Sequence, residues 1–216
     1  MTKTKEIEKI NNFLVNNEKI EFNSKNYKKI EFIYGIAIKE IKHKLEILKE
    51  EYKMFYNYDL IDHINERIKS KESISRKMTK KGIDFTYSKM IENINDIAGV
   101  RVICPLKKDI YTIRKLITNL PGIKILKEKD YITNPKKSGY SSYHMILEVP
   151  VTLSKNSVYA KVEVQIRTMA MDFWASLEHK MKYKNNKDLS KNVSKELVQC
   201  AKIVNKLDNK MLLLNS

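Results

Sequence analysis

Residues 159–168 read YAKVEVQIRT, and the alternation of side chains in this stretch decides how the middle of the chain folds. Its apolar side chains stand at every second position, at Val162, Val164 and Ile166. Successive side chains of a strand point to opposite faces of a sheet, so this spacing predicts a β-strand with one face on a core. The other face carries polar residues, among them Glu163, and such a face is commonly only solvated surface. Its purpose has to be judged from the rest of the chain.

The neighbouring segments predict further strands and amphipathic helices. Apolar residues at helical spacing or at every second position, together with Gly and Pro at the breaks, mark the boundaries. Helices before, between and after a few strands predict an α/β or α+β domain around a mixed sheet of about five strands, flanked by helices. Strands are expected at 61–70, 97–104, 122–132, 143–151 and 158–167, and helices at 3–20, 27–56, 71–82, 86–96, 107–120, 169–184 and 195–214.

Composition narrows the class of partner. Lys and Arg number 42 against 26 Asp and Glu, a net charge of +16 that attracts polyanions such as nucleic acid, nucleotide phosphates or an anionic membrane surface. No apolar run is long enough to cross a bilayer, and the first residues lack the core of a signal peptide. Cys104 and Cys200 lie far apart and match no metal-binding spacing, which favours reduced thiols and a cytoplasmic location. Glycine-rich phosphate-binding motifs are absent, so side chains would have to bind any phosphate.

Two acidic residues are candidates for metal-assisted chemistry. Asp96 comes directly before the strand expected at 97–104, and Glu163 lies on the polar face of YAKVEVQIRT. Mg²⁺ takes oxygen ligands and is usually held by one or two carboxylates together with substrate phosphates. An Asp at the boundary of an element is also a common cap. Both interpretations of Asp96 stay open at this point.

The segment SGYSSYH, residues 138–144, is the second unusual stretch. Gly139 lets the loop turn sharply and present Tyr140, whose ring could stack on a nucleobase. His144 could donate to a phosphate or ribose, or could face inward with its ring nitrogens satisfied. Around these residues the chain carries many cations that could contact phosphates, namely Arg67, Lys69, Lys77, Lys80, Lys81, Arg101, Lys136 and Lys137.

Two smaller expectations concern helices. Ser73 could cap the basic helix expected at 71–82, which Gly82 would close. Met171, Phe173 and Trp174 are expected to form a patch that faces the core from the helix at 169–184.

Four stretches in order resemble the synthetase domain of the RelA/SpoT-type GTP pyrophosphokinases, specifically the small single-domain alarmone synthetases. They are RIKSKESISRKM, DIAGVRVIC, DYITNPKKSGYSSYH and VEVQIRTMAMDFWASLEHKMKYK, which together run from Arg67 to Lys184. The resemblance implies a nucleotidyltransferase-like fold and one synthetase domain over residues 1–216. Within it, N-terminal helices would span 1–58, a catalytic core 59–184 and a C-terminal helix 185–216.

The same resemblance implies an activity in stringent-response signalling. Pyrophosphate would pass from ATP to the ribose 3′-OH of GTP, GDP or GMP with release of AMP, and Mg²⁺ would be the cofactor. The residue-by-residue match assigns Asp96 and Glu163 to catalysis and metal binding. It assigns Arg67, Lys69, Ser73, Lys77 and Arg101 to ATP, and Lys136, Tyr140, His144 and Gln165 to the guanine nucleotide.

The chain departs from the family pattern on the acceptor side. Ser138 and Ser141 stand where relatives often have Asn and Arg, and Asp172 stands where some have Asn, so the preferred acceptor stays open. Arg167 stays open between a phosphate contact and structural pairing. With only 4 His and no His-Asp dipeptide, a synthesis-only enzyme is expected.

Small relatives are commonly tetramers, so a homotetramer without a membrane partner is expected. The alternatives are an RNA-binding regulatory protein without catalysis, whose basic face and Tyr140 would bind single-stranded RNA, and another enzyme of nucleotidyltransferase fold.

Overall fold

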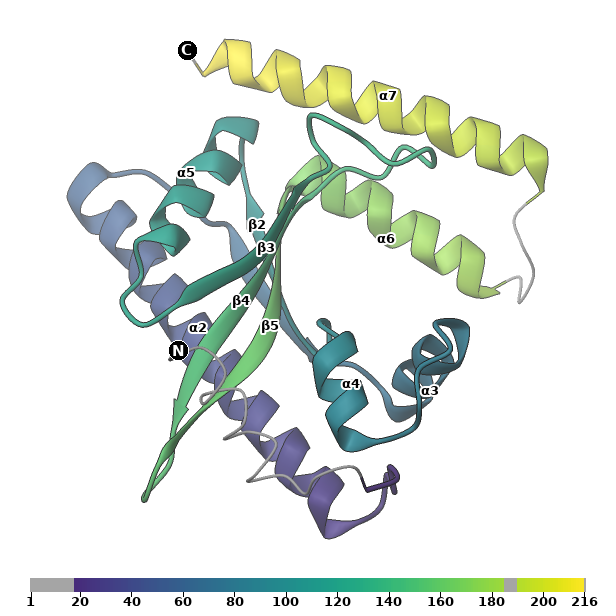
Figure 1. Ribbon diagram of the computed structural model, residues 1–216. Helices are drawn as coiled ribbons and strands as arrows, with labels where there is room; N and C mark the ends of the chain where they lie inside the picture. The colour runs from purple at the N-terminus through teal and green to yellow at the C-terminus, as the bar shows by residue number, and fades with distance from the viewer. Residues whose placement is uncertain (1–17, 185–189, 216) are drawn as a thin grey trace.

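The computed structural model describes residues 18–184 and 190–215, and its centre is a five-stranded sheet in the order β1-β2-β5-β4-β3 (Figure 1). β2 and β5 run parallel, and the other neighbouring strands run antiparallel. This arrangement confirms the mixed sheet expected from the sequence. The strands are β1 (His63–Ile68), β2 (Ala98–Cys104), β3 (Lys124–Asp130), β4 (Tyr143–Thr152) and β5 (Ser157–Thr168).

Helices cover the two faces of the sheet unequally (Figure 1). The described helices are α2 (Lys25–Tyr56), α3 (Lys71–Lys80), α4 (Tyr87–Asn93), α5 (Lys107–Thr118), α6 (Met169–Lys184) and α7 (Lys191–Leu214). Apolar side chains of α2 and α5 pack with those of the sheet in one core, which also includes buried side chains of α3 and α4. On the other face α3, α4 and α6 stand around the sheet, and α7 packs along α6. No described helix is long and apolar enough to cross a membrane.

The hydrophobic patterns explain why these elements form. The apolar stripe of α2 recurs every three or four residues and is buried at Ile30, Ile33, Ala37, Ile41 and Leu45, as the sequence predicts. On β5 the predicted alternation is also present. Val162, Val164 and Ile166 are each 0% exposed, whereas Glu163 between them is only half-buried and points to the opposite face.

The register of the strands places polar side chains in two rows across the open face of the sheet. In the first row Arg67 pairs with Gly99, Gly99 with Glu163, Glu163 with Ile146 and Ile146 with Lys127. The second row runs through Arg101, Gln165, His144 and Lys129. Because Gly99 has no side chain, the stem of Arg67 lies over it, 3.6 Å from where a Cβ would stand.

Three local expectations differ from the structure. Ser70 caps α3, because its Oγ accepts from the backbone N–H of Ser73, so Ser73 lies inside the helix. Phe173 is 66% exposed, because it points away from the stripe that buries Met171 and Trp174. The helix expected at 3–20 lies mostly outside the described residues, and within its last residues Lys19 forms a β-bridge to Thr86.

The loop between β3 and β4 is held against the C-terminal helices. Gly139 has a φ of +88°, in the left-handed region that favours glycine. This agrees with the sharp turn predicted at this position from the sequence. A Cβ on Gly139 would stand 2.5 Å from the Cβ of Ala201 in α7. Beside it, the Trp174 indole of α6 donates to the carbonyl of Leu197 in α7. The loop therefore depends on both helices for its shape.

We expect Gly139→Ala to lower the free energy of unfolding by about 1–3 kcal/mol, because it combines a strained φ with a clash against α7. Urea denaturation measures the change. Gly35→Ala is the matched control: Gly35 lies within α2 with open space around it and should gain about 0.5–1 kcal/mol from better helix propensity. Equal effects of the two substitutions would contradict the packing described for this loop.

Candidate active site

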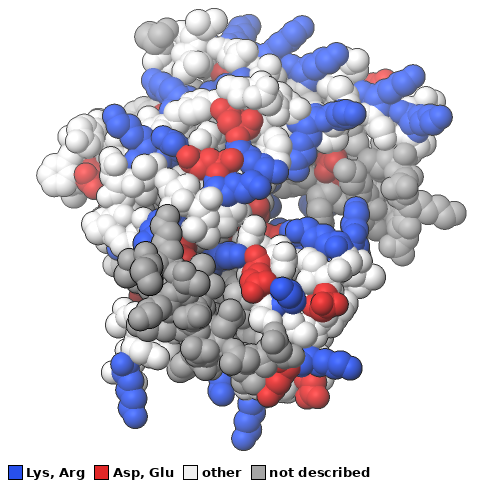
Figure 2. All heavy atoms as spheres, viewed as in Figure 1, with Lys and Arg blue, Asp and Glu red and all other residues white. Residues whose placement is uncertain are grey.

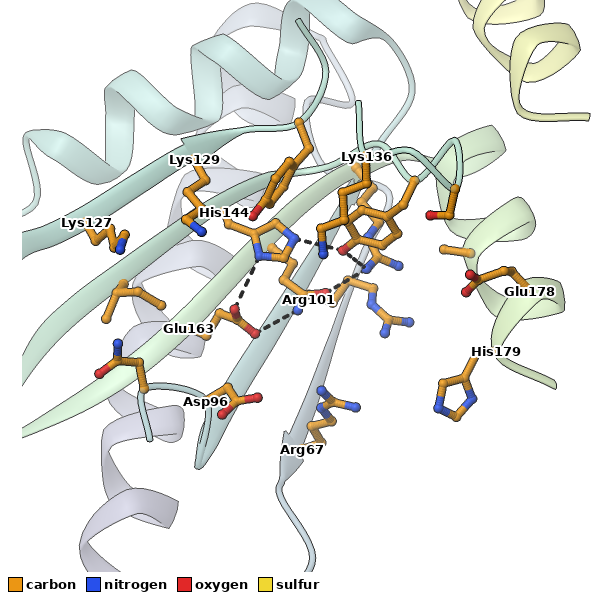
Figure 3. A pocket seen from close by; sticks show the side chains of 18 of the residues that line it. Arg67, Asp96, Arg101, Lys127, Lys129, Lys136, His144, Glu163, Glu178 and His179 are labelled. Carbon is orange, nitrogen blue, oxygen red and sulfur yellow. Dashed lines mark hydrogen bonds and ion pairs between the residues drawn. The ribbon is translucent and has the colours of Figure 1, made fainter. Parts of the chain in front are cut away.

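A cleft of about 790 Å³ lies on the open face of the sheet. Lys and Arg side chains stand around a hollow in the face shown in Figure 2. The floor of the cleft is formed by the two rows of side chains on the sheet, and its far wall by Glu178 and His179 of α6 (Figure 3). The loop between β3 and β4 adds Lys136 and Tyr140. Three parts of the fold that are distant in the sequence therefore meet at one polar cavity.

Asp96 stands at one end of this cleft, two residues before β2. Its two carboxylate oxygens receive Lys69 Nζ at 3.1 Å and Lys77 Nζ at 2.7 Å. Burial acts to raise the pKa of Asp96, but the hydrogen bond from Lys77 and the charges of both lysines outweigh it and hold the pKa below its ordinary value. Asp96 is thus an ionised carboxylate between two cations.

Glu163 lies on the floor, beside Asp96 (Figure 3). One oxygen is 3.3 Å from Nδ1 of His144, and the other accepts a hydrogen bond of 2.8 Å from the amide nitrogen of Gln165. Burial and the Asp96 charge act to raise the pKa of Glu163. The contacts with His144 and Gln165 act to lower it, and the balance lies below the ordinary value. A second ionised carboxylate therefore faces the same cavity.

Arg167 takes part in structural pairing. It is only 4% exposed, and its Nη1 donates to Asp172 at 3.0 Å. The same oxygen of Asp172 also forms an ion pair with Nη1 of Arg101 at 3.1 Å, so one carboxylate neutralises two guanidinium groups. The Nε of Arg101 is buried and has no hydrogen-bond partner among the described residues.

The loop side of the cleft is aromatic and basic. The ammonium of Lys136 lies 4.7 Å from the ring centre of Tyr131 and 4.5 Å from that of Tyr140. The Tyr140 hydroxyl is 2.8 Å from Nε2 of His144. His144 could either contact a ligand or have its ring nitrogens satisfied within the protein. In the structure both nitrogens contact protein partners, and His144 also lines the cleft.

The structure brings most of the residues selected from the sequence to this one cleft. Its lining includes Arg67, Lys77, Asp96, Arg101, Lys136, Tyr140, His144, Glu163 and Gln165. Lys69 reaches the site through its contact with Asp96. Ser73 lies in the first turn of α3, outside the lining, and its backbone N–H donates to Ser70.

Other lining residues were not selected from the sequence. Lys127 and Lys129 belong to the polar face of β3, and Glu178 and His179 to α6. The alternation on β3 could have pointed to the two lysines. Nothing in the helical pattern of α6 distinguishes its cleft side from solvent.

Lys161 is a further residue that the sequence reading missed. It sits two positions before Glu163 on the polar face of β5, and its ammonium donates to the carbonyls of Ile91 and Glu92 at 3.2 and 2.8 Å. Its third contact is the side-chain oxygen of Asn95 at 3.1 Å. An ammonium has three N–H donors, and these contacts match that number. Lys161 thereby satisfies carbonyls at the end of α4 and fixes the segment that leads into Asp96.

Asp96 and Glu163 are the residues that could hold a metal ion here. Both are ionised oxygen donors that line one cavity, which is the donor chemistry Mg²⁺ prefers, so they fit this ion. The described part of the chain contains no group of three or more His, Cys, Asp or Glu side chains that could form a metal site.

Comparison with known proteins gives concordant matches. Residues 66–188 match the family model described as a region found in RelA / SpoT proteins. GTP pyrophosphokinase YwaC of Bacillus subtilis (strain 168) is 45% identical over 180 residues, which cover 83% of this chain and 86% of YwaC.

Two solved structures of small alarmone synthetase 1 from Bacillus subtilis share the fold. The form bound to its product pppGpp matches with a TM-score of 0.83 and 30% identity, covering 89% of this chain and 97% of that one. The form bound to AMPCPP matches with a TM-score of 0.76 and 27% identity over the same shares.

We expect Lys161→Met to lower the free energy of unfolding by about 1–3 kcal/mol, because two helix-terminal carbonyls and the Asn95 side chain lose their donor. Urea denaturation measures the change. Lys155→Met is the matched control, since Lys155 is exposed on the turn between β4 and β5 and its loss should cost less than 0.5 kcal/mol. A control effect as large as that of Lys161→Met would show that Lys161 does not anchor this segment.

Proposed function

The chain belongs to the family of RelA/SpoT proteins, and from that premise we propose that it is a GTP pyrophosphokinase that makes alarmones. It transfers the β,γ-pyrophosphoryl group of ATP to the 3′-OH of a guanine nucleotide and releases AMP. The observation that carries the proposal is that two ionised carboxylates, Asp96 and Glu163, line the same cleft together with many cations. Transfer between two polyphosphates needs both features, because the transition state is highly anionic.

We assign the ATP side of the cleft to the end that holds Asp96. Lys69 and Lys77, which now pair with Asp96, are placed to contact the phosphates of ATP. Arg67 lies over Gly99, and both Arg67 and Arg101 line the cleft, so the planar faces of their guanidinium groups are assigned to flank the adenine. Ser73 stays part of this assignment by sequence match alone.

The guanine nucleotide is assigned to the other end. Lys136 and Tyr140 stand there together, a cation for phosphate and a ring for stacking on the base. His144 and Gln165 flank Glu163 and would lie beside the acceptor ribose. This order places the two nucleotides on either side of Glu163.

Glu163 is the proposed base. As the 3′-oxygen bonds to the β-phosphorus of ATP, the bond between that phosphorus and the oxygen that bridges it to the α-phosphorus breaks. AMP leaves with the electron pair of that bond. The ionised Glu163 accepts the proton of the 3′-OH. Asp96 and Glu163 would hold Mg²⁺, which when bound supplies neutralisation of phosphate charge.

The acceptor is proposed to be GTP, GDP or GMP without a ranking among them. An RNA-binding protein without catalysis would use the same basic surface, but it gives no role to two ionised carboxylates placed among the cations. The proposed enzyme accounts for both.

A homo-oligomer, in keeping with a tetramer, is also proposed. Apolar side chains of α7 remain exposed, with Ile203 at 65% and Leu213 and Leu214 at 73%. Such side chains on a long amphipathic helix would be covered by another copy of the chain.

The direct test is product analysis. Purified protein is incubated with ATP, Mg²⁺ and GTP, GDP or GMP, and the nucleotides are resolved by anion-exchange chromatography. We expect AMP and a 3′-pyrophosphorylated guanine nucleotide to appear in equal amounts with at least one acceptor. Formation of AMP without the guanine product, or of neither, contradicts the proposal.

Glu163→Gln gives the matched variant for this assay. It keeps the shape and a hydrogen-bonding oxygen but cannot accept the proton, so we expect turnover to fall at least 100-fold with the fold unchanged by circular dichroism. Lys155→Met, on the exposed turn, serves as the active control. Retained turnover in Glu163→Gln would remove Glu163 from its proposed role.

A further inference from the structure

Two chains of hydrogen bonds lead from Arg167 to the two oxygens of Glu163. One passes through Tyr140 and His144, and the other through Gln165. Figure 3 shows the contact between His144 and Glu163. Both begin at the same nitrogen, Nη2, which lies 2.6 Å from the Tyr140 hydroxyl and 2.8 Å from Oε1 of Gln165. The two hydrogens of that nitrogen suffice for the two contacts.

The direction of each chain follows from the chemistry of its first member. A guanidinium only donates, so the Tyr140 oxygen and the Gln165 oxygen must accept. Gln165 then presents its amide nitrogen, a donor, to Glu163 at 2.8 Å. The two contacts together fix the orientation of the Gln165 amide.

The same reasoning fixes the ring of His144. Having accepted from Arg167, the Tyr140 hydroxyl has its hydrogen available for Nε2 of His144, 2.8 Å away. In a neutral ring Nδ1 then carries the proton and donates to Glu163. The opposite tautomer would set the lone pair of Nδ1 against the carboxylate at 3.3 Å, which is repulsive.

We propose that Arg167 is a positioning residue that, through Tyr140 and Gln165, holds His144 in the Nδ1–H tautomer and aims two donors at Glu163. Arg167 is fixed in turn by Asp172 on Nη1 and by Ser142 on Nε. Because Arg167 is buried and held by these contacts, it can orient the side chains of Tyr140 and Gln165 on the acceptor side of the cleft. The catalytic meaning of this arrangement rests on the proposed function, whereas the tautomer itself does not.

The tautomer is measured directly by ¹⁵N NMR on protein labelled at histidine, without nucleotides. Two-bond correlations between ring protons and nitrogens distinguish the tautomers, and the spectra are recorded at a pH where the ring is neutral. The chain has 4 His, so a His144→Gln sample assigns the signal. We expect Nδ1–H for His144, the tautomer that free histidine disfavours. An Nε2–H ring in the wild-type protein overturns the proposal.

Two variants test the path from Arg167. Tyr140→Phe keeps the ring but removes the hydroxyl, and Arg167→Lys keeps the charge but loses the fork that reaches two acceptors. In both we expect the share of the Nε2–H tautomer to rise above the wild-type share, because Nε2 loses its donor, while the contact with Glu163 still favours a proton on Nδ1. A wild-type share retained in both variants overturns the role of Arg167.

Matched controls separate orientation from general damage. Tyr143→Phe removes a hydroxyl that donates to Glu128, and Arg114→Lys removes a forked contact with the same carboxylate. Neither group touches His144 through a hydrogen bond in the described structure. Both should leave the His144 tautomer as in the wild type, and a shift in either contradicts the specific path.

Kinetics give a second, separable readout. If the proposed function holds, Tyr140→Phe should lower kcat about tenfold, the effect of losing one orienting hydrogen bond, with KM for ATP unchanged. An unchanged kcat alongside a raised share of the Nε2–H tautomer would refute the positioning role while leaving the pyrophosphokinase assignment standing. Absence of any wild-type turnover would refute the proposed function while the NMR result still decides the tautomer.

Discussion

The parallel pairing of β2 with β5 is the constraint on which the rest of the site depends. It sets Gly99 beside Glu163 and Arg101 beside Gln165, and it brings the segment before β2, with Asp96, next to the middle of β5. Parallel neighbours need a long crossover, and here α5 and the β3–β4 hairpin supply it. The crossover adds strands and a helix to the core while its loop carries Tyr140 back over the cleft.

Two carboxylates of the site, those of Asp96 and Asp172, each form ion pairs with two cations. Asp96 is held by Lys69 and Lys77, and Asp172 by Arg101 and Arg167. A buried charge without a partner is costly, so such pairing lets many ionised groups share a small volume. In the proposed function, the phosphates of ATP would take over the lysines at one end, whereas the deeply buried Arg167 contacts protein partners.

Much of this fold follows from periodicity that is visible in the sequence. The alternation on β5 and the stripe on α2 identify their buried faces because each depends only on local geometry. Two predictions, the cap of α3 and the burial of Phe173, were wrong for equally local reasons. Ser70 and Ser73 are both plausible caps, and only the backbone shows that the helix begins after Ser70. Phe173 lies on the helix face opposite Met171, so its exposure follows from the helical phase set by the preceding strand.

Other parts of the site could not be predicted from the sequence. Arg167 donates to a hydroxyl 27 positions away, and Lys161 to carbonyls at the end of a helix some 70 positions away. Such contacts depend on the packing of distant elements, and no residue spacing encodes them. The resemblance to the family identifies Glu163, Gln165 and Tyr140 together as candidate site residues. Only the hydrogen bonds in the structure show how the side chains of Gln165 and Tyr140 are oriented.

We propose that both nucleotides bind in the one cleft, on either side of Glu163. A crystal structure of the Glu163→Gln protein with a non-hydrolysable ATP analogue and a guanine nucleotide tests it most directly. We expect the analogue's phosphates beside Lys77 and Asp96, and the acceptor 3′-oxygen within hydrogen-bond reach of residue 163. Density for either nucleotide outside the cleft, with residue 163 facing only protein, would contradict it.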